Sequence, residues 1–491
     1  MLLAPHLRER SMQFLTAPLS WLCTVLLLPI PATQSPPSLA AQVPERGKLE
    51  VLAKEALENP RAYAMLAELC AVAPKRLSGS KGAAAAVQWG QKTMLSLGLE
   101  NVRLEPCMVP HWERGTLESL VLVSASGAAP ERLSVCSLGG SPPTPADGIE
   151  AEIVMVKSFE ELEGLGERAR GKAVFFNRPM DPVRPSLFQA YGGAVDQRSR
   201  GSAAAAKAGA LCAIVRSMTL ALDDHPHTGA MRYEKDACVP TVAISTLGAE
   251  RLATLLSRGE TPRVKLDLDC RWYEDAPSFN VVGEILGHEK PEEIVLVGGH
   301  LDAWDLSVGA HDDGAGCVQA LEVMRLIKTL GWKPRRTLRV ILWMNEENGL
   351  RGATGYRDTH REKIDRHVFA LESDRGGFAP RGFESNSTGA DLARLAAIGE
   401  QLRPYGIQYV SHSTGVGADV GPLHELGVPC AGFIPESARY FDVHHSALDT
   451  LESVHPRELQ LGALCMAYLC FSVAEFAEPL GRVTPAPATQ H

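Results

Sequence analysis

The feature that most constrains this 491-residue chain is a set of apolar runs that each end in acidic or histidine residues. Such runs are typical of buried strands, and in an α/β fold the carboxyl ends of parallel strands meet at one edge of the sheet. We therefore expect the polar ends to converge there. The runs are 294–297 before His300 and Asp302, 338–343 before Glu346 and Glu347, 369–371 before Asp374, and 440–443 before His444 and His445.

The residue types at these ends favour a metal site. Imidazole and carboxylate groups are ligands for zinc and similar ions. His300 and Asp302 form a His-x-Asp triplet, and Asp312 opens an Asp-Asp-Gly-Ala-Gly segment soon after it. The Asp302 carboxylate can accept a hydrogen bond from the second ring nitrogen of His300 and fix its tautomer. Taken alone, these residues also fit a buried histidine with turn aspartates, and Glu346 and Glu347 fit a solvated pair.

Five sequence blocks together resemble those of the co-catalytic dizinc exopeptidases, which include zinc aminopeptidases and glutamate carboxypeptidases. The blocks are Gly-Gly-His-Leu-Asp, His-Asp-Asp-Gly-Ala-Gly, Asn-Glu-Glu, Glu-Ser-Asp and His-His-Ser-x-x-Asp-Thr. The C-terminal blocks are most similar to the plasma glutamate carboxypeptidase (carboxypeptidase Q) branch. The resemblance implies an α/β fold with a mixed, mostly parallel central sheet flanked by helices, and an inserted β-rich domain of the protease-associated type.

The resemblance also implies a role for each polar end. Two zinc ions (Zn2+) would bind per chain, with Asp312 bridging them. Glu346 would be the catalytic general base, free of metal so that it can gain and lose a proton in each turnover. Two dications about 3.5–4 Å apart need a shared anionic ligand, which suits a bridging aspartate. The remaining implied ligands are His300 and Asp374 in one site, and Glu347 and His445 in the other.

Two assignments stay open. His444 and His445 compete for one coordination position, and in the family the ligand is the histidine directly before Ser or Thr, which selects His445 before Ser446. His444 would then be a catalytic donor to the oxyanion, or a merely structural histidine. Asp302 and Asp449 would hydrogen-bond to the metal ligands without binding metal themselves, or be ordinary turn residues.

The chain divides into five parts. Residues 42–117 open with helical periodicity, residues 118–270 contain strand-like runs and many turn residues, and strand–helix alternation resumes over residues 271–478. No expected ligand falls within 118–270, which resembles the protease-associated domain inserted in relatives. Residues 1–41 are predicted to be an export signal, and residues 479–491 a disordered tail.

Composition narrows the partners and the compartment. The net charge is −9 and no Lys/Arg run is present, which argues against binding to nucleic acid. The export signal predicts a secreted or periplasmic protein without a stable membrane span in its mature form; an uncleaved anchor is the alternative. None of the eleven cysteines forms a CxxC pair, although one or two disulfides are possible. A homodimer is also possible.

The sequence thus predicts a zinc-dependent exopeptidase that hydrolyses dipeptides or short peptides. The resemblance favours a carboxypeptidase or dipeptidase. An aminopeptidase is the alternative, because the group that anchors the charged end of the substrate cannot be located in the sequence. A non-catalytic relative and a single-zinc glutaminyl cyclase are two further alternatives, and the complete ligand set together with Glu346 opposes both.

Overall fold

The computed structural model describes residues 46–123, 129–232 and 238–484. The expected export signal, residues 1–41, lies outside the described residues, as do residues 485–491 of the expected tail. Among the described residues, no helix is long and apolar enough to cross a membrane.

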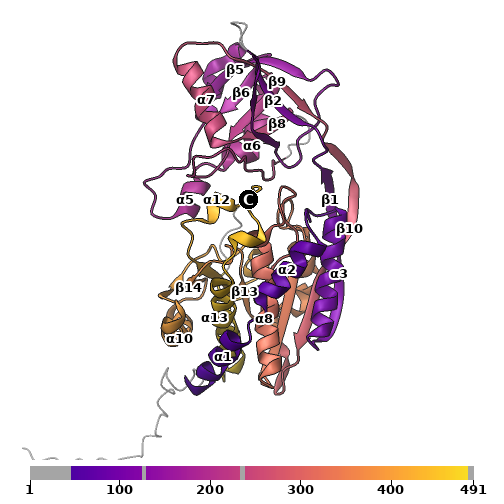
Figure 1. Cartoon of the computed structure of the whole chain (residues 1–491). Coiled ribbons are helices and arrows are strands. Elements are labelled where there is room, and N and C mark those ends of the chain that lie inside the picture. The colour runs from indigo at the N-terminus through magenta and orange to yellow at the C-terminus, as the bar shows by residue number, and fades with distance from the viewer. Residues whose placement is uncertain (1–45, 124–128, 233–237, 485–491) are drawn as a thin grey trace, which may run out of the picture. The chain divides into compact units, whose positions relative to one another are not determined.

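A sheet of eight strands carries three of the four polar strand ends expected from the sequence (Figure 1). The fourth run, residues 440–443, is not a strand but the short helix α12. In the sheet, strands β12, β11, β13 and β16 run parallel to one another, and β10 and β14 flank them in antiparallel pairs. This confirms the expected mixed, mostly parallel sheet. In spatial order the strands are β1 (Glu100–Glu113), β10 (Arg271–Ile285), β12 (Arg336–Trp343), β11 (Lys290–His300), β13 (His367–Glu372), β16 (Cys430–Pro435), β14 (Pro380–Ser385) and β15 (Tyr409–His412).

Helices cover both faces of this sheet. In β11, Val295 and Val297 join the hydrophobic core that includes α8 and α13, whereas Ile294 and Leu296 join the core that includes α9. Successive side chains of a strand point to opposite faces, so a strand buried on both faces is apolar throughout. The helices are α1 (Arg46–Glu58), α2 (Ala62–Val72), α3 (Lys81–Ser96), α8 (Ala315–Thr329), α9 (Arg351–His360), α10 (Gly389–Gln401), α11 (Gly421–His424), α12 (Tyr440–Val443) and α13 (Pro456–Glu475).

The residues that lie between β1 and β10 in the chain form a second eight-stranded sheet. Strands β5, β6, β7 and β8 are parallel in it, and the other pairs are antiparallel. In spatial order it contains β3 (Glu131–Leu133), β2 (Glu118–Val123), β9 (Arg263–Leu268), β5 (Ile149–Val156), β6 (Ala173–Phe176), β7 (Cys212–Arg216), β8 (Thr241–Ile244) and β4 (Val135–Ser137). Its helices are α4 (Phe159–Leu165), α5 (Leu187–Gly192), α6 (Asp196–Lys207) and α7 (Thr246–Ser257). That this segment is a protease-associated domain stays a proposal.

The strands β1 and β10 pair along their whole length, from Glu100 opposite Glu284 to Glu113 opposite Arg271, and so connect the two sheets. Beyond the end of β1, the buried Arg114 forms an ion pair with Asp305 at 2.6 Å and donates to the carbonyl of Ser137. This guanidinium therefore ties the second sheet to the loop that follows β11.

Trp304, in the same loop, packs into the hydrophobic core of the second sheet. Its ring lies so close to Gly139 that a Cβ atom at this position would overlap the ring. Trp304 is 4 % exposed, so the inserted segment holds the loop that leads from His300 to Asp312.

Two expectations about the chain are modified by the structure. Residues 479–484 were expected in a disordered tail, but Leu480 is buried and the Val483 amide donates to the Gly427 carbonyl at 3.1 Å. Burial of one apolar side chain outweighs the Pro/Thr-rich composition of this short segment. No disulfide joins two cysteines among the described residues.

We expect Gly139→Ala to displace the Trp304 ring and to lower the free energy of unfolding by about 1–3 kcal/mol, the usual cost of overpacking a core. Chemical denaturation measures this loss. Gly164→Ala is the matched control, because a Cβ atom at Gly164 in α4 would meet no other atom within 4 Å. An equal loss in both variants would contradict the proposed contact.

Candidate active site

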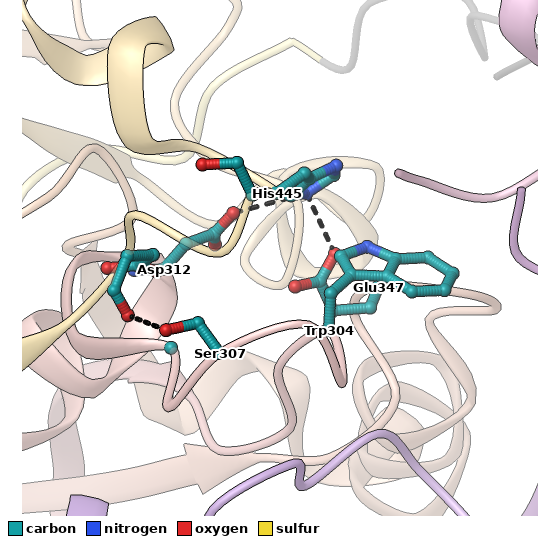
Figure 2. A pocket seen from close by; sticks show the side chains of 8 residues that line it. Trp304, Ser307, Asp312, Glu347 and His445 are labelled. Atoms are coloured by element: carbon teal, nitrogen blue, oxygen red, sulfur yellow. Dashed lines mark hydrogen bonds and ion pairs between the residues drawn. The ribbon is translucent and has the colours of Figure 1, made fainter. Parts of the chain in front are cut away.

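The expected ligands come from separate elements and meet in one buried place. His300 ends β11, Glu347 follows β12, and Asp374 follows β13. Asp312 lies in the turn before α8, and His445 follows α12. Figure 2 shows Asp312, His445 and Glu347 facing one another in the pocket that Trp304 and Ser307 also line.

Asp312 lies between two histidine–carboxylate pairs. Its Oδ1 is 3.1 Å from His300 Nε2, and its Oδ2 is 3.1 Å from His445 Nε2. His300 Nε2 is also 3.3 Å from Asp374 Oδ1, and His445 Nε2 is 3.1 Å from Glu347 Oε2. The structure therefore brings together all five residues that the sequence marked as ligands, with one carboxylate in the middle.

The turn that carries Asp312 is held by two further aspartates. Asp449 accepts hydrogen bonds from the backbone amides of His311 at 2.6 Å and Asp312 at 3.1 Å. Asp313, joined to Asp312 by a cis peptide bond, accepts from the His300 amide at 3.0 Å. Asp449 is thus in contact with the backbone of a ligand, as the supporting role requires.

Asp302 also supports the site, but not through the expected bond. We expected its carboxylate to accept from the second ring nitrogen of His300; instead, His300 Nδ1 lies 2.9 Å from the backbone oxygen of Asp302. The carboxylate turns toward the end of β12, where it accepts from the amides of Asn345 at 2.7 Å and Glu346 at 3.1 Å. Asn345 has a φ of 74°, so these amides leave the sheet ladder and need another acceptor.

Burial and mutual repulsion raise the pKa of the two adjacent glutamates at the site. Burial raises the pKa of Glu347 to about 7, and the charge of Asp312 adds to this effect. Burial also raises the pKa of Glu346 well above its usual range, and the carboxylates of Asp374 and Glu347 contribute. Among the described residues, Glu347 Oε1 is buried without a hydrogen-bond partner. Buried, partly unsatisfied carboxylates that repel one another are stabilised by cations.

The pKa of His444 shifts in the opposite direction from those of His300 and His445. Burial disfavours the charged imidazole of His300 and of His445, yet the facing carboxylates raise the pKa of both well above the usual range. Burial, and next the neighbouring His445, hold the pKa of His444 well below its usual range. The ring centroids of His444 and His445 are 3.6 Å apart, and His444 Nε2 is 3.6 Å from Asp312 Oδ2. The set of imidazole and carboxylate donors suits zinc.

Comparison with known proteins gives the family of this chain. The profile of peptidase family M28 matches residues 280–470. Carboxypeptidase Q of Bos taurus is 39% identical over 425 residues, which span 86% of this chain and 87% of that protein. Carboxypeptidase Q of Homo sapiens is 38% identical over 426 residues, with the same two coverages. This chain belongs to peptidase family M28. It is a zinc-dependent hydrolase.

Solved structures agree with this assignment. A peptidase M28 precursor from Shewanella amazonensis is 32% identical, has a TM-score of 0.86, and covers 91% of this chain and 100% of its own. A zinc aminopeptidase from Bacillus subtilis has a TM-score of 0.61 at 22% identity, covering 83% of this chain and 93% of its own, and shows the shared fold alone.

The inserted segment of this M28 peptidase contacts the tandem histidines, although none of the expected ligands lies there. His227 Nδ1 is 2.7 Å from the carbonyl oxygen of His444, and the Thr228 amide donates to the carbonyl of His445 at 2.9 Å. His445 has a φ of 60°, a left-handed conformation that costs energy in a non-glycine residue. The contacts from the second sheet therefore help to hold the backbone at the ligand.

Arg198 is a second residue of the inserted segment at the site. Its side chain is 9% exposed, and Nη1 is 3.4 Å from His445 Nδ1. Among the described residues no ion pair joins it to a carboxylate, and its Nε is buried without a hydrogen-bond partner. The guanidinium lies 5.6 Å from the centre of the Tyr191 ring. The sequence gave no signal for this role, because Arg198 occurs in the polar start of a helix, where arginines are usually solvated.

Arg76 is a further residue that sequence reasoning missed. It is completely buried and donates from Nε to the carbonyl of Leu301 at 2.7 Å, from Nη2 to that of Gly309 at 2.7 Å, and from Nη1 to that of Val308. These three carbonyls lie on the segment between His300 and Asp312, two of the expected ligands. One guanidinium therefore holds both ends of the loop between them.

We expect Arg76→Lys to destabilise the enzyme, because an ammonium group cannot reproduce three hydrogen bonds of the guanidinium fork. Each buried carbonyl left without a donor costs about 1–3 kcal/mol, so the melting temperature should fall by several degrees. Arg184→Lys is the control, since Arg184 forms an exposed pair with Asp181. An unchanged melting temperature for Arg76→Lys would contradict the role assigned to this side chain.

Proposed function

We propose that this protein is a secreted dinuclear zinc exopeptidase that hydrolyses dipeptides or short peptides, with carboxypeptidase or dipeptidase activity favoured. The observation that carries the proposal is the position of Asp312, whose two oxygens face two different histidine–carboxylate pairs. The identity to carboxypeptidase Q proteins supports the same conclusion.

In this proposal Asp312 would be shared by two zinc ions, because five protein ligands are too many for one tetrahedral ion. His300 and Asp374 would complete one site, and Glu347 and His445 would complete the other. When bound, the zinc ions polarise the scissile carbonyl and make water a better nucleophile.

Glu346 is the proposed general base. Its backbone is held by Asp302, and neither of its carboxylate oxygens takes part in the ion pairs around Asp312 among the described residues. Glu346 takes a proton from the attacking water and gives it to the nitrogen of the leaving amine. His444, kept neutral by burial and by His445, has an N–H that can donate to the oxygen of the tetrahedral intermediate.

Arg198 supports the carboxypeptidase direction. A guanidinium that is nearly buried beside His445, and that has no acidic partner among the residues the structure describes, is suited to bind a carboxylate of the substrate. Another arginine near the site, Arg375, differs because it already lies 3.8 Å from a carboxylate oxygen of Glu384. We therefore infer that Arg198 anchors the free carboxylate of a dipeptide.

Alternatives predict different anchors. An aminopeptidase would bind the substrate ammonium, and the aminopeptidases among the solved structures share only the fold at this level of identity. A non-catalytic relative or a single-zinc glutaminyl cyclase would leave part of the complete ligand set without a role. Export and a possible homodimer remain proposals from the sequence.

Metal analysis tests the dinuclear site. We expect about two zinc ions per chain in the purified enzyme, and Asp312→Ala should lose more metal than any single change at His300, Glu347, Asp374 or His445, because only Asp312 serves both ions. One ion or none after zinc has been supplied would refute the dinuclear arrangement.

Adjacent glutamates should separate in their effects. Glu346→Gln should keep both zinc ions and the fold but reduce kcat by about 10²-fold or more, because it removes only the proton transfer. Glu347→Gln should weaken one metal site. Metal loss from the first variant with full loading of the second would reverse the two roles.

The tandem histidines give a further test. His445→Ala should release metal, because His445 lies between Asp312 and Glu347. His444→Ala should retain metal and lower kcat more than it changes KM, the pattern expected when a contact forms mainly in the transition state. If His444→Ala is metal-replete with unchanged kinetics, its role is structural.

Dipeptides with blocked ends test the direction of cleavage. The enzyme should accept an N-acetylated dipeptide and reject the corresponding C-terminal amide. Arg198→Gln should raise KM about tenfold or more for substrates with a free carboxylate, the usual effect of losing a charge-assisted hydrogen bond. Arg200→Gln, on the same helix but exposed and paired with Asp196, is the control. Acceptance of the amide and rejection of the N-acetyl substrate would make the enzyme an aminopeptidase.

A further inference from the structure

A second cavity, of about 340 Å³, lies where the inserted segment, the β1–β10 pair and the turn after β12 meet. Ligand pockets usually have volumes of about 300–1,000 Å³, so this one suits a small molecule. No residue of the proposed metal site lines it. Its walls are formed by Pro110, Gly139, Gly140, Ala230, Met231, Trp272, Asp275, Asn348, Gly349 and Arg351.

This cavity lies next to the active-site pocket. Residues that line one pocket contact, or are adjacent in the chain to, residues that line the other. Trp304 lines the active-site pocket, and its ring packs against Gly139, which lines the second cavity. Likewise, Glu347 lines the first pocket and the following residue, Asn348, lines the second. An occupant of the second cavity would therefore lie against the back of the elements that carry the catalytic residues.

The cavity contains one positive and one negative charge. Arg351 and Asp275 form an ion pair, and their side chains are 44% and 47% exposed. Among the described contacts, Arg351 uses only Nη1, toward Asp275 Oδ2 and the Met108 carbonyl. Its other donors and Asp275 Oδ1 are left for a ligand. Because ion pairs at exposed positions contribute little to folding, their rearrangement around a ligand costs little.

The rest of the lining is apolar or backbone. Pro110, Met231 and the indole of Trp272 provide apolar surface, and Gly139 and Gly140 contribute backbone atoms. Trp272 is 44% exposed. A ligand that matches this cavity carries an ammonium and a carboxylate close together, and a small apolar group.

We propose that this cavity binds a free α-amino acid with an apolar side chain. The carboxylate pairs with the guanidinium of Arg351, the ammonium pairs with Asp275, and the side chain packs on Trp272 and Met231. The inference does not require the peptidase activity, although such amino acids are products of the proposed reaction.

A ligand in this cavity would affect the turn at Asn345, which precedes the proposed base Glu346. The Asn348 side chain accepts hydrogen bonds from Ser78 Oγ at 2.7 Å and from the Asn345 side-chain amide. The Arg351 amide, in turn, donates to the Asn345 side-chain oxygen at 3.2 Å. Asn345 directly precedes Glu346, so a ligand held by Arg351 contacts the same hydrogen-bonded turn as the proposed base.

Calorimetry on the zinc-replete, full-length protein tests the proposal with three probes. These are L-leucine, N-acetyl-L-leucine, which lacks the ammonium, and L-leucinamide, which lacks the carboxylate. Wild-type protein should bind leucine about tenfold or more tightly than either analogue, because each analogue loses one charge-assisted contact.

Variants assign each contact to its partner. Arg351→Gln should weaken leucine binding and remove the preference for leucine over leucinamide. Asp275→Asn should remove the preference for leucine over N-acetyl-leucine. Arg357→Gln is the matched control, because Arg357 lies on the same helix and pairs instead with Asp358 and Glu425; it should bind all three probes as the wild type does.

Two results would overturn the proposal. One is the absence of leucine binding to the wild type. The other is leucine binding that is unchanged in both Arg351→Gln and Asp275→Asn, which would place any bound leucine at the metal site instead. Binding is read directly, so a failure of the proposed peptidase activity would leave this test intact.

Discussion

Repulsion among buried carboxylates is the interaction on which the rest of the structure depends. Glu346, Glu347 and Asp374 follow strand ends that share one edge of the sheet, and the turn before α8 brings Asp312 to them. Burial of like charges raises the pKa of the glutamates and would oppose folding if nothing compensated for it. The imidazoles of His300 and His445 offset part of this repulsion, and bound cations would offset the rest.

Three acids near the centre that are not proposed ligands accept hydrogen bonds from backbone amides. Asp302 accepts from the amides at the end of β12, and Asp449 accepts from those at the turn before α8. Glu372 accepts in the same way from the amides of Ala418 and Val420, at 2.8 and 2.7 Å. Each of these bonds fixes a loop beside the site, so charge stabilisation and positioning of the ligands are achieved by the same contacts.

Much of the fold, and the set of residues that meet at the candidate site, could be predicted from the sequence. Apolar runs such as 338–343 are buried on both faces, which makes them recognisable without knowledge of their neighbours. The group that accepts from His300 Nδ1 was predicted wrongly, because the direction of the Asp302 side chain depends on the amides left free at Asn345. Arg76 and Arg198 were missed, because their partners are far away in the chain and a solvated arginine looks the same in sequence.

The sequence by itself determined which residues end the strands, and hence the chemistry available at the edge of the sheet. Periodicity and residue type are local properties, and they survive without tertiary contacts. Only the tertiary structure decided how the inserted segment contacts His444 and His445, which guanidinium lies beside them, and where a second cavity opens behind Trp304. These features arise from contacts between residues hundreds of positions apart, whose geometry is set by the packing of the two sheets.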